Sequence, residues 1–118
     1  MNEAEFKRRT RQLGLDVIAF LDVLPRNTAG RVLGRQLVRS ASSVGANYRA
    51  ACRAKSRAHL ISKLGDVEEE TDETLHWLEM IRDARLADGP ELAKLVAETE
   101  SILRMVVASL KTLKQRSE

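Results

Sequence analysis

The sequence of 118 residues is poor in aromatic side chains, which make up 3% of it, and it holds one cysteine and two prolines. A single cysteine excludes an intramolecular disulfide, and the scarcity of aromatic residues and turn signals argues against a β-sandwich or barrel. No apolar run is long enough to cross a bilayer, and no secretory signal is expected at the charged N-terminus. We therefore expect one small cytoplasmic domain over residues 1–118, with no membrane partner.

Four segments carry hydrophobic residues at intervals of three and four, which is the spacing of one face of a helix. Pro25 ends the first segment, Asn27 or Thr28 can cap the second, Ser56 can cap the third, and Pro90 begins the fourth. The pattern predicts helices over residues 4–24, 28–53, 56–86 and 90–115. Four helices with short connections predict an all-α protein, an antiparallel up-down-up-down four-helix bundle.

Charge is divided along the chain into two opposed blocks. Residues 23–65 hold nine basic residues and no acidic one, whereas residues 66–100 hold twelve acidic residues and three basic ones. At 100° per residue, five arginines of the second predicted helix fall within about 80°, on the side opposite its apolar face. This arginine face consists of Arg31, Arg35, Arg39, Arg49 and Arg53.

The arginine face has three interpretations. It can bind a polyanion, because guanidinium groups bind phosphate in a two-point contact and such contacts supply most non-specific affinity for nucleic acid. It can be a solvated surface whose arginines pair with acids of the third helix. It can also be a subunit contact, with the second helix of one protomer against the third helix of the next.

Three further positions suggest packing roles. Gly34 and Gly45 lie in a row of small residues on one edge of the second helix, where another backbone can approach closely, and we assign them to a subunit interface. Trp77 lies off the apolar stripe of the third helix, which predicts an interface anchor. Asn47, at the edge of the apolar face, is expected to make a structural hydrogen bond to a neighbouring helix.

Signals for catalysis are weak. The chain has no glycine-rich phosphate loop, no nucleophile elbow and no zinc-ligand spacing. Glu73 and His76 form one Glu-x-x-His motif, but a di-iron bundle needs two. Cys52 borders the apolar face and is expected to be a small buried hydrophobe. We therefore expect no metal, no cofactor and no enzymatic activity.

Two stretches resemble a known family. They are QLVRSASSVGAN, residues 36–47, and ETLHWLE, residues 73–79, with Lys63-Leu64 between them. They resemble the four helix bundle proteins that are encoded in intervening sequences of bacterial large-subunit ribosomal RNA genes. Where the family usually continues the Ala-Asn pair with a small apolar residue and an acid, this chain has Tyr48 and Arg49.

The resemblance implies a bundle that assembles into a ring, expected to be a pentamer. The related accessory variability determinant of diversity-generating retroelements is a pentameric barrel that binds nucleic acid and a reverse transcriptase. We therefore expect a non-enzymatic homo-oligomer that binds nucleic acid, structured RNA above all, through the arginine face. The alternative is a protein-interaction scaffold whose opposed charge blocks serve only subunit assembly or the docking of another protein.

Overall fold

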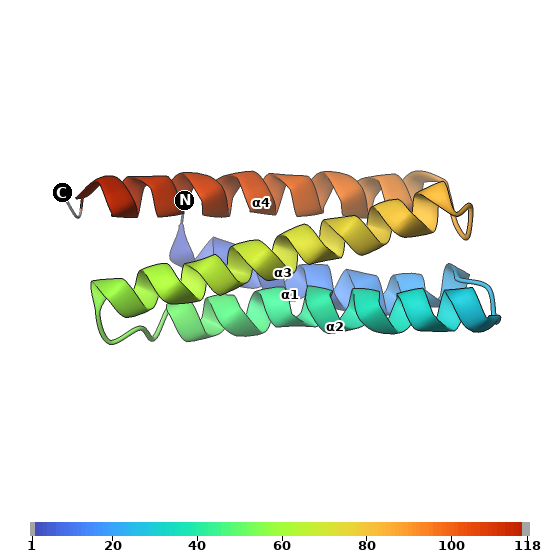
Figure 1. The fold of residues 1–118 in the computed structure, drawn as a ribbon, viewed down its shortest axis with the longest axis horizontal. Helices are drawn as coiled ribbons and strands as arrows, with labels where there is room; N and C mark the ends of the chain where they lie inside the picture. The colour runs from blue at the N-terminus through green and yellow to red at the C-terminus, as the bar shows by residue number, and fades with distance from the viewer. Residues whose placement is uncertain (1, 117–118) are drawn as a thin grey trace.

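The computed structural model describes residues 2–116, which form four antiparallel helices in an elongated bundle of 49 × 21 × 19 Å. The elements are α1 (Glu3–Phe20), the short 3-10 helix η1 (Leu21–Val23), α2 (Thr28–Ala51), α3 (Arg57–Asp83) and α4 (Pro90–Arg116). Helices that follow one another in the sequence lie side by side, and the chain runs up and down the bundle (Figure 1). The predicted all-α four-helix bundle is confirmed.

Side-chain caps set the starts of three helices. Asn2 accepts from the Glu5 amide at 3.0 Å, Asn27 from the Gly30 amide at 2.8 Å, and Ser56 from the His59 amide at 3.0 Å. Each cap satisfies a backbone donor that has no partner inside its helix. The C-terminal ends of the helices differ more from the prediction than their starts. The first helix ends at Phe20 and not near residue 24, because the last turn before Pro25 is the 3-10 helix η1.

The core lies along the common axis of the helices and includes fully buried Leu37, Val67 and Ile102. Buried threonines of three helices belong to it as well. The hydroxyls of Thr10, Thr71 and Thr99 each donate to the carbonyl oxygen four residues earlier, at 3.0, 2.6 and 2.7 Å. Burial of these hydroxyls therefore costs little free energy, since each keeps a hydrogen bond.

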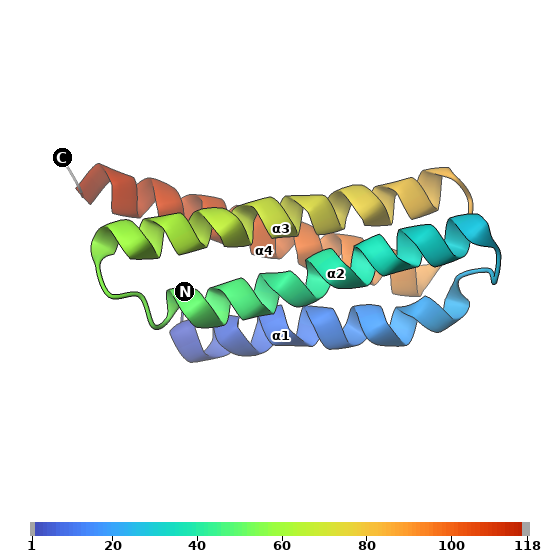
Figure 2. The same cartoon turned by 60° about the horizontal axis from the view of Figure 1, so that its bottom comes forward.

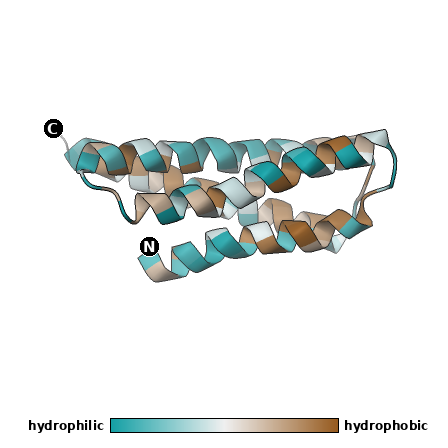
Figure 3. Ribbon diagram, turned by 90° about the horizontal axis from the view of Figure 1, so that it is seen from below, coloured by the Kyte–Doolittle hydropathy of each residue, from teal (hydrophilic) through white to brown (hydrophobic). Residues whose placement is uncertain are grey.

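Apolar and polar residues alternate along each helix, as expected of helices with one face in the core (Figure 3). The N-terminal half of α1 is hydrophilic, whereas its second half, toward η1, is hydrophobic. Leu15 and Ile18 in that second half are 41% and 53% exposed. No helix in residues 2–116 is long and apolar enough to span a membrane.

The helices do not end level with one another. By rise per residue, α1 is about 27 Å long and α4 about 40 Å. The first turns of α3 and the last turns of α4 therefore project beyond the start of α1 (Figures 1 and 2). We call this part of the bundle the overhang, and define it as residues 57–64 of α3 and 105–116 of α4. Met105 marks its inner boundary, because its Sδ still accepts a hydrogen bond from Arg9 Nη1 of α1 at 3.2 Å.

Candidate nucleic-acid interface

The arginine face of α2 points into solvent between α1 and α3. One edge of α2 meets α1, where Gly45 lies against the Thr10 carbonyl oxygen. The other edge meets α3, where the Thr74 hydroxyl donates to Ser40 Oγ at 3.0 Å. All five arginines are exposed. Four of them lie on α2, whereas Arg53 lies in the turn after Ala51, so the helix ends two residues earlier than predicted. From Arg31 to Arg49 the face is about 27 Å long.

Arg39 is the member of the arginine face that pairs with acids of α3. Its guanidinium contacts the Glu73 carboxylate, and its Nη1 lies 3.6 Å from Glu70 Oε2. The hydrogen bond to Glu73 raises the pKa of Arg39 above its ordinary value. At this position the interpretation as a solvated, ion-paired surface holds.

The other four arginines have no carboxylate partner within residues 2–116. Arg31 donates to the backbone carbonyl of Arg26 at 3.3 Å, which leaves its charge uncompensated. Arg35, Arg49 and Arg53 are exposed and make no ion pair in that part of the chain. Three of these charges, on Arg31, Arg35 and Arg49, lie along one side of α2, and the fourth, on Arg53, lies in the turn that follows the helix.

Two residues of α1 enlarge the basic surface. Lys7 and Arg11 line a groove of about 300 Å³ between α1 and α2, together with Arg49. Small residues and two exposed apolar ones also line this groove; they are Gly14, Ser42, Gly45 and Ala46, with Leu15 and Ile18. No carboxylate is among the described residues that line it. The sequence did not single out Lys7 and Arg11, because residues 1–22 carry equal numbers of acids and bases. Only the geometry of the helix brings these two bases to the side of α1 that faces the groove.

Gly34 and Gly45 have roles inside the chain. A Cβ on Gly45 would lie 3.1 Å from the Thr10 carbonyl oxygen and 3.2 Å from Arg11 Cα, both in the backbone of α1. A Cβ on Gly34 would lie 3.1 Å from the Leu24 side chain. The close approach that their small size allows is made within the protomer, so these glycines no longer argue for a subunit contact.

Trp77 and Asn47 also contact their own chain. Trp77 is half-buried and packs against the core, with its ring edge-on to His76 at a centroid distance of 4.8 Å. Its indole N–H is buried and has no acceptor among the described residues. Asn47 Nδ2 donates to the Ser43 carbonyl at 3.0 Å, so its bond stays within α2 and does not reach a neighbouring helix as predicted.

Glu73 and Cys52 were considered above for metal binding and covalent chemistry. Glu73 pairs with Arg39, and within residues 2–116 no group of three or more acids, histidines or cysteines could hold a metal ion. Cys52 is half-buried. Burial first, and then the hydrogen bond that the thiol donates to the Glu3 carboxylate, raise the pKa of the thiol. A protonated thiol is a poor nucleophile.

Similarity to known proteins agrees with this architecture. A family model described as 23S rRNA-intervening sequence protein matches residues 2–108. The chain belongs to that family. The resemblance drawn from residues 36–47 and 73–79 is thereby confirmed.

A solved structure has the same fold. It is the crystal structure of a protein with unknown function from the S23 ribosomal protein family of Bacteroides thetaiotaomicron. The two chains are 25% identical and superpose with a TM-score of 0.85, over 94% of this chain and 99% of the other. No curated protein sequence matches the chain.

Proposed function

We propose that this member of the 23S rRNA-intervening sequence proteins is a non-enzymatic homo-oligomer that binds structured RNA. The observation that carries the proposal is the arginine face, in which four of five guanidinium groups are exposed and have no carboxylate partner within residues 2–116. Acids on α3 neutralise only Arg39, so most of the positive charge remains available to a polyanion.

The contacts would be made to the RNA backbone. Guanidinium groups bind phosphate oxygens in pairs, and phosphate contacts position a nucleic acid without reading its sequence. Ser42 and Ala46, which are exposed between the arginines, leave room for a backbone to approach α2. Lys7 and Arg11 would extend the same contact onto α1. The chain offers few aromatic residues, so stacking of bases is not the main source of affinity.

Assembly into a ring would strengthen this binding. Each subunit repeats the arginine face, and weak contacts on a common scaffold add through effective concentration. Exposed apolar residues on α1 and α2 favour a subunit contact; they are Leu15, Ile18 and Val32. The ring is expected to be a pentamer.

The salt dependence of RNA binding tests the proposal. The variant Arg35→Gln/Arg49→Gln/Arg53→Gln should bind an RNA hairpin more weakly, with a shallower slope of log K against log salt. Each lost phosphate contact reduces the slope by about 0.7 to 0.9.

The matched control removes the same charge elsewhere, at exposed residues outside the arginine face. It is Arg8→Gln/Lys94→Gln/Arg104→Gln. If both triple variants lose the same affinity and slope, general positive charge explains binding and the proposal fails.

The alternative function is a scaffold in which the arginine face is a subunit contact. The opposed charge blocks favour it, since residues 23–65 hold nine basic residues and no acid, whereas residues 66–100 hold twelve acids and three bases. In that case the variant of the arginine face would lower the mass of the particle in light scattering, and the wild-type protein would not retain RNA.

A further inference from the structure

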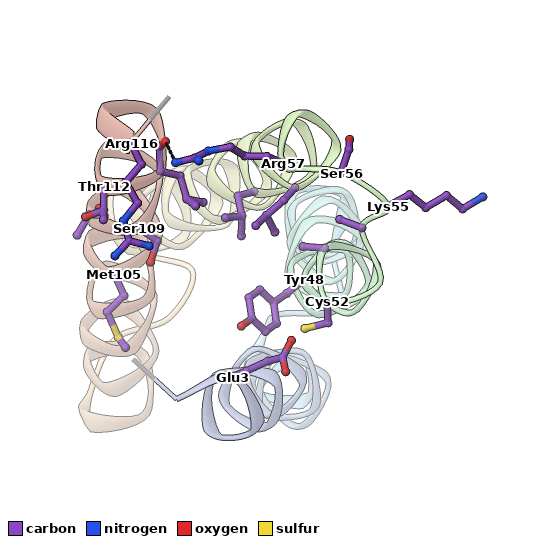
Figure 4. A pocket seen from close by; sticks show the side chains of 16 residues that line it. Glu3, Tyr48, Cys52, Lys55, Ser56, Arg57, Met105, Ser109, Thr112 and Arg116 are labelled. Carbon is purple, nitrogen blue, oxygen red and sulfur yellow. Dashed lines mark hydrogen bonds between the residues drawn. The ribbon is translucent and has the colours of Figure 1, made fainter. Parts of the chain in front are cut away.

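A cavity of about 1110 Å³ opens at the overhang, between the first turns of α3 and the last turns of α4. The ends of α1 and α2 close its inner side, with Glu3, Tyr48 and Cys52 among the lining residues (Figure 4). This cavity lies at the end of the bundle and shares no lining residue with the groove beside Lys7, Arg11 and Arg49.

The cavity exists because the overhang lacks the helices that cover α3 and α4 elsewhere. Along the rest of the bundle the inner faces of α3 and α4 pack against α1 and α2. In the overhang the inner sides of Leu60, Met105 and Leu113 remain half-buried, and Ala108 is exposed. Within residues 2–116 no further helix lies between these turns of α3 and α4, and the cleft that they form is lined by these apolar residues together with Ser109 and Thr112.

Positive charge surrounds this cleft. Lys55, Arg57 and Arg116 belong to its lining, against one acid, Glu3. The surrounding segments 51–65 and 101–116 together contain eight basic residues and no acidic one. Segments far apart in the sequence meet here, because α4 returns beside the start of α3. Arg57 is held in place by donating to the Leu113 carbonyl at 2.8 Å.

We propose that this cleft binds an acidic amphipathic helix of a partner protein. Apolar side chains on one face of that helix would fill the space over Leu60, Met105 and Ala108. Its carboxylates would meet the guanidinium groups of Arg57 and Arg116. A groove between two helices accepts a third helix by interlocking of side-chain ridges, which is a recurrent mode of peptide recognition.

The lining distinguishes this occupant from a nucleotide. The lining combines aliphatic side chains with the hydroxyls of Ser56, Ser109 and Thr112. Its one aromatic residue, Tyr48, is 6% exposed and lies edge-on to Phe6 at a centroid distance of 4.7 Å. The cleft therefore offers no open ring face to a base, whereas bound bases usually stack on aromatic side chains.

A second copy of the chain fits less well. The acidic segment of this protein is α3, and α3 already buries its apolar face in its own core. Among the described residues, the large hydrophobic side chain that α3 exposes is Met80, at 43%. A helix with one exposed hydrophobic residue cannot fill an apolar cleft several turns long.

Binding of a designed peptide tests the proposal. The probe is a fluorescein-labelled helix of about four turns, with leucines on one face at intervals of three and four and glutamates elsewhere. The matched control peptide has lysine at every glutamate position. Fluorescence anisotropy at about 0.15 M salt should show binding of the glutamate peptide and none of the lysine peptide at the same concentration.

Two variants locate the binding. Ala108→Glu places a carboxylate in the cleft at an exposed helical position. It should weaken binding of the glutamate peptide by about tenfold or more through charge repulsion. Arg57→Gln/Arg116→Gln should do the same by removing the partners of the carboxylates. Arg8→Gln/Lys94→Gln, which removes the same charge outside the cleft, should leave the affinity within about twofold.

Several results would overturn the proposal. Equal binding of both peptides would mean that the charge of the cleft does not select the probe. Equal loss in the control variant would mean that general positive charge, and not the cleft, attracts it. Unchanged affinity in Ala108→Glu, with an unchanged melting curve, would place the peptide elsewhere. A variant that binds no peptide but loses affinity for an oligouridylate would make the cleft a nucleic-acid contact. A lower particle mass in Ala108→Glu would make it a subunit contact.

Discussion

Arg9 on α1 and Glu98 on α4 form a two-point ion pair across the bundle. Arg9 Nε donates to Glu98 Oε2 at 3.0 Å, and Arg9 Nη2 donates to Glu98 Oε1 at 2.6 Å. The pair joins the two neighbouring helices that pack least against each other. The hydrogen bonds that Arg9 donates to Glu98 raise the pKa of Arg9 above its ordinary value, although burial opposes this.

We expect this pair to contribute to holding α1 against α4. Arg9→Gln or Glu98→Gln should lower the free energy of unfolding by about 1 kcal/mol, because the pair is two-point and partly buried. Urea unfolding followed by the fluorescence of Trp77, the single tryptophan, measures the change. The exposed Arg8→Gln is the control, and a double variant that loses the full sum of the single losses would show that the residues are not coupled.

Two helical glycines should respond oppositely to alanine. A Cβ on Gly65 meets nothing within 4 Å, so Gly65→Ala should raise the free energy of unfolding by about 0.5–1 kcal/mol through helix propensity. A Cβ on Gly30 would lie 2.0 Å from the Pro25 carbonyl oxygen, so Gly30→Ala must displace the turn. It should lower the free energy of unfolding by about 1–3 kcal/mol. Equal effects of the two changes in urea unfolding would contradict this account.

Glu70 should make stability depend on pH. Burial raises the pKa of its carboxyl, repulsion from Glu73 adds to this, and Arg39 opposes it. A raised native pKa means that the folded state holds the proton more tightly than the unfolded state. Stability from this group is therefore full below its ordinary pKa, about 4.3, and is lost as pH rises through the native pKa.

The variant Glu70→Gln removes this effect. Between pH 4 and neutral pH its free energy of unfolding should fall less than that of the wild-type protein, by a few tenths to about 1 kcal/mol. Urea unfolding at a series of pH values measures the difference, with the exposed Asp72→Asn as the control. Parallel pH curves for Glu70→Gln and the wild-type protein would show that Glu70 titrates normally.

Arg39 and Arg35 should differ in their contribution to RNA binding. Arg35 makes no ion pair in the described chain, whereas Arg39 would have to leave Glu73 before it could bind a phosphate. Arg35→Gln should therefore weaken binding of an RNA hairpin at low salt more than Arg39→Gln does. Filter binding over a series of salt concentrations compares them, and a larger loss in Arg39→Gln would place the contact on the α3 side of α2.

The exposed apolar residues of α1 should matter for assembly. Light scattering of the wild-type protein at micromolar concentration should give about five times the subunit mass of 13.2 kDa. Ile18→Lys, at a residue 53% exposed, should lower this mass while leaving the melting curve of the subunit nearly unchanged. A wild-type monomer would exclude the ring, and an unchanged mass in Ile18→Lys would place the contact elsewhere.

The sequence by itself determined the helices, their order and the arginine face. The signals for the helices are local. They are the spacing of apolar residues, Asn27 and Ser56 as caps, and Pro25 as a stop, and each acts on residues within a few positions of itself in the chain. The exposure of Arg35 and Arg49 follows equally from their angle on α2, since the apolar face must turn inward.

Only the tertiary structure decided which neighbours these residues have. It turned Gly45 toward α1, paired Arg39 with Glu73, and brought Lys7 beside Arg49. It also placed α4 next to the start of α3, which creates the basic cleft of the overhang. These outcomes depend on the packing angles and relative lengths of helices that are distant in the sequence, and the spacing of residues within one helix carries no information about either.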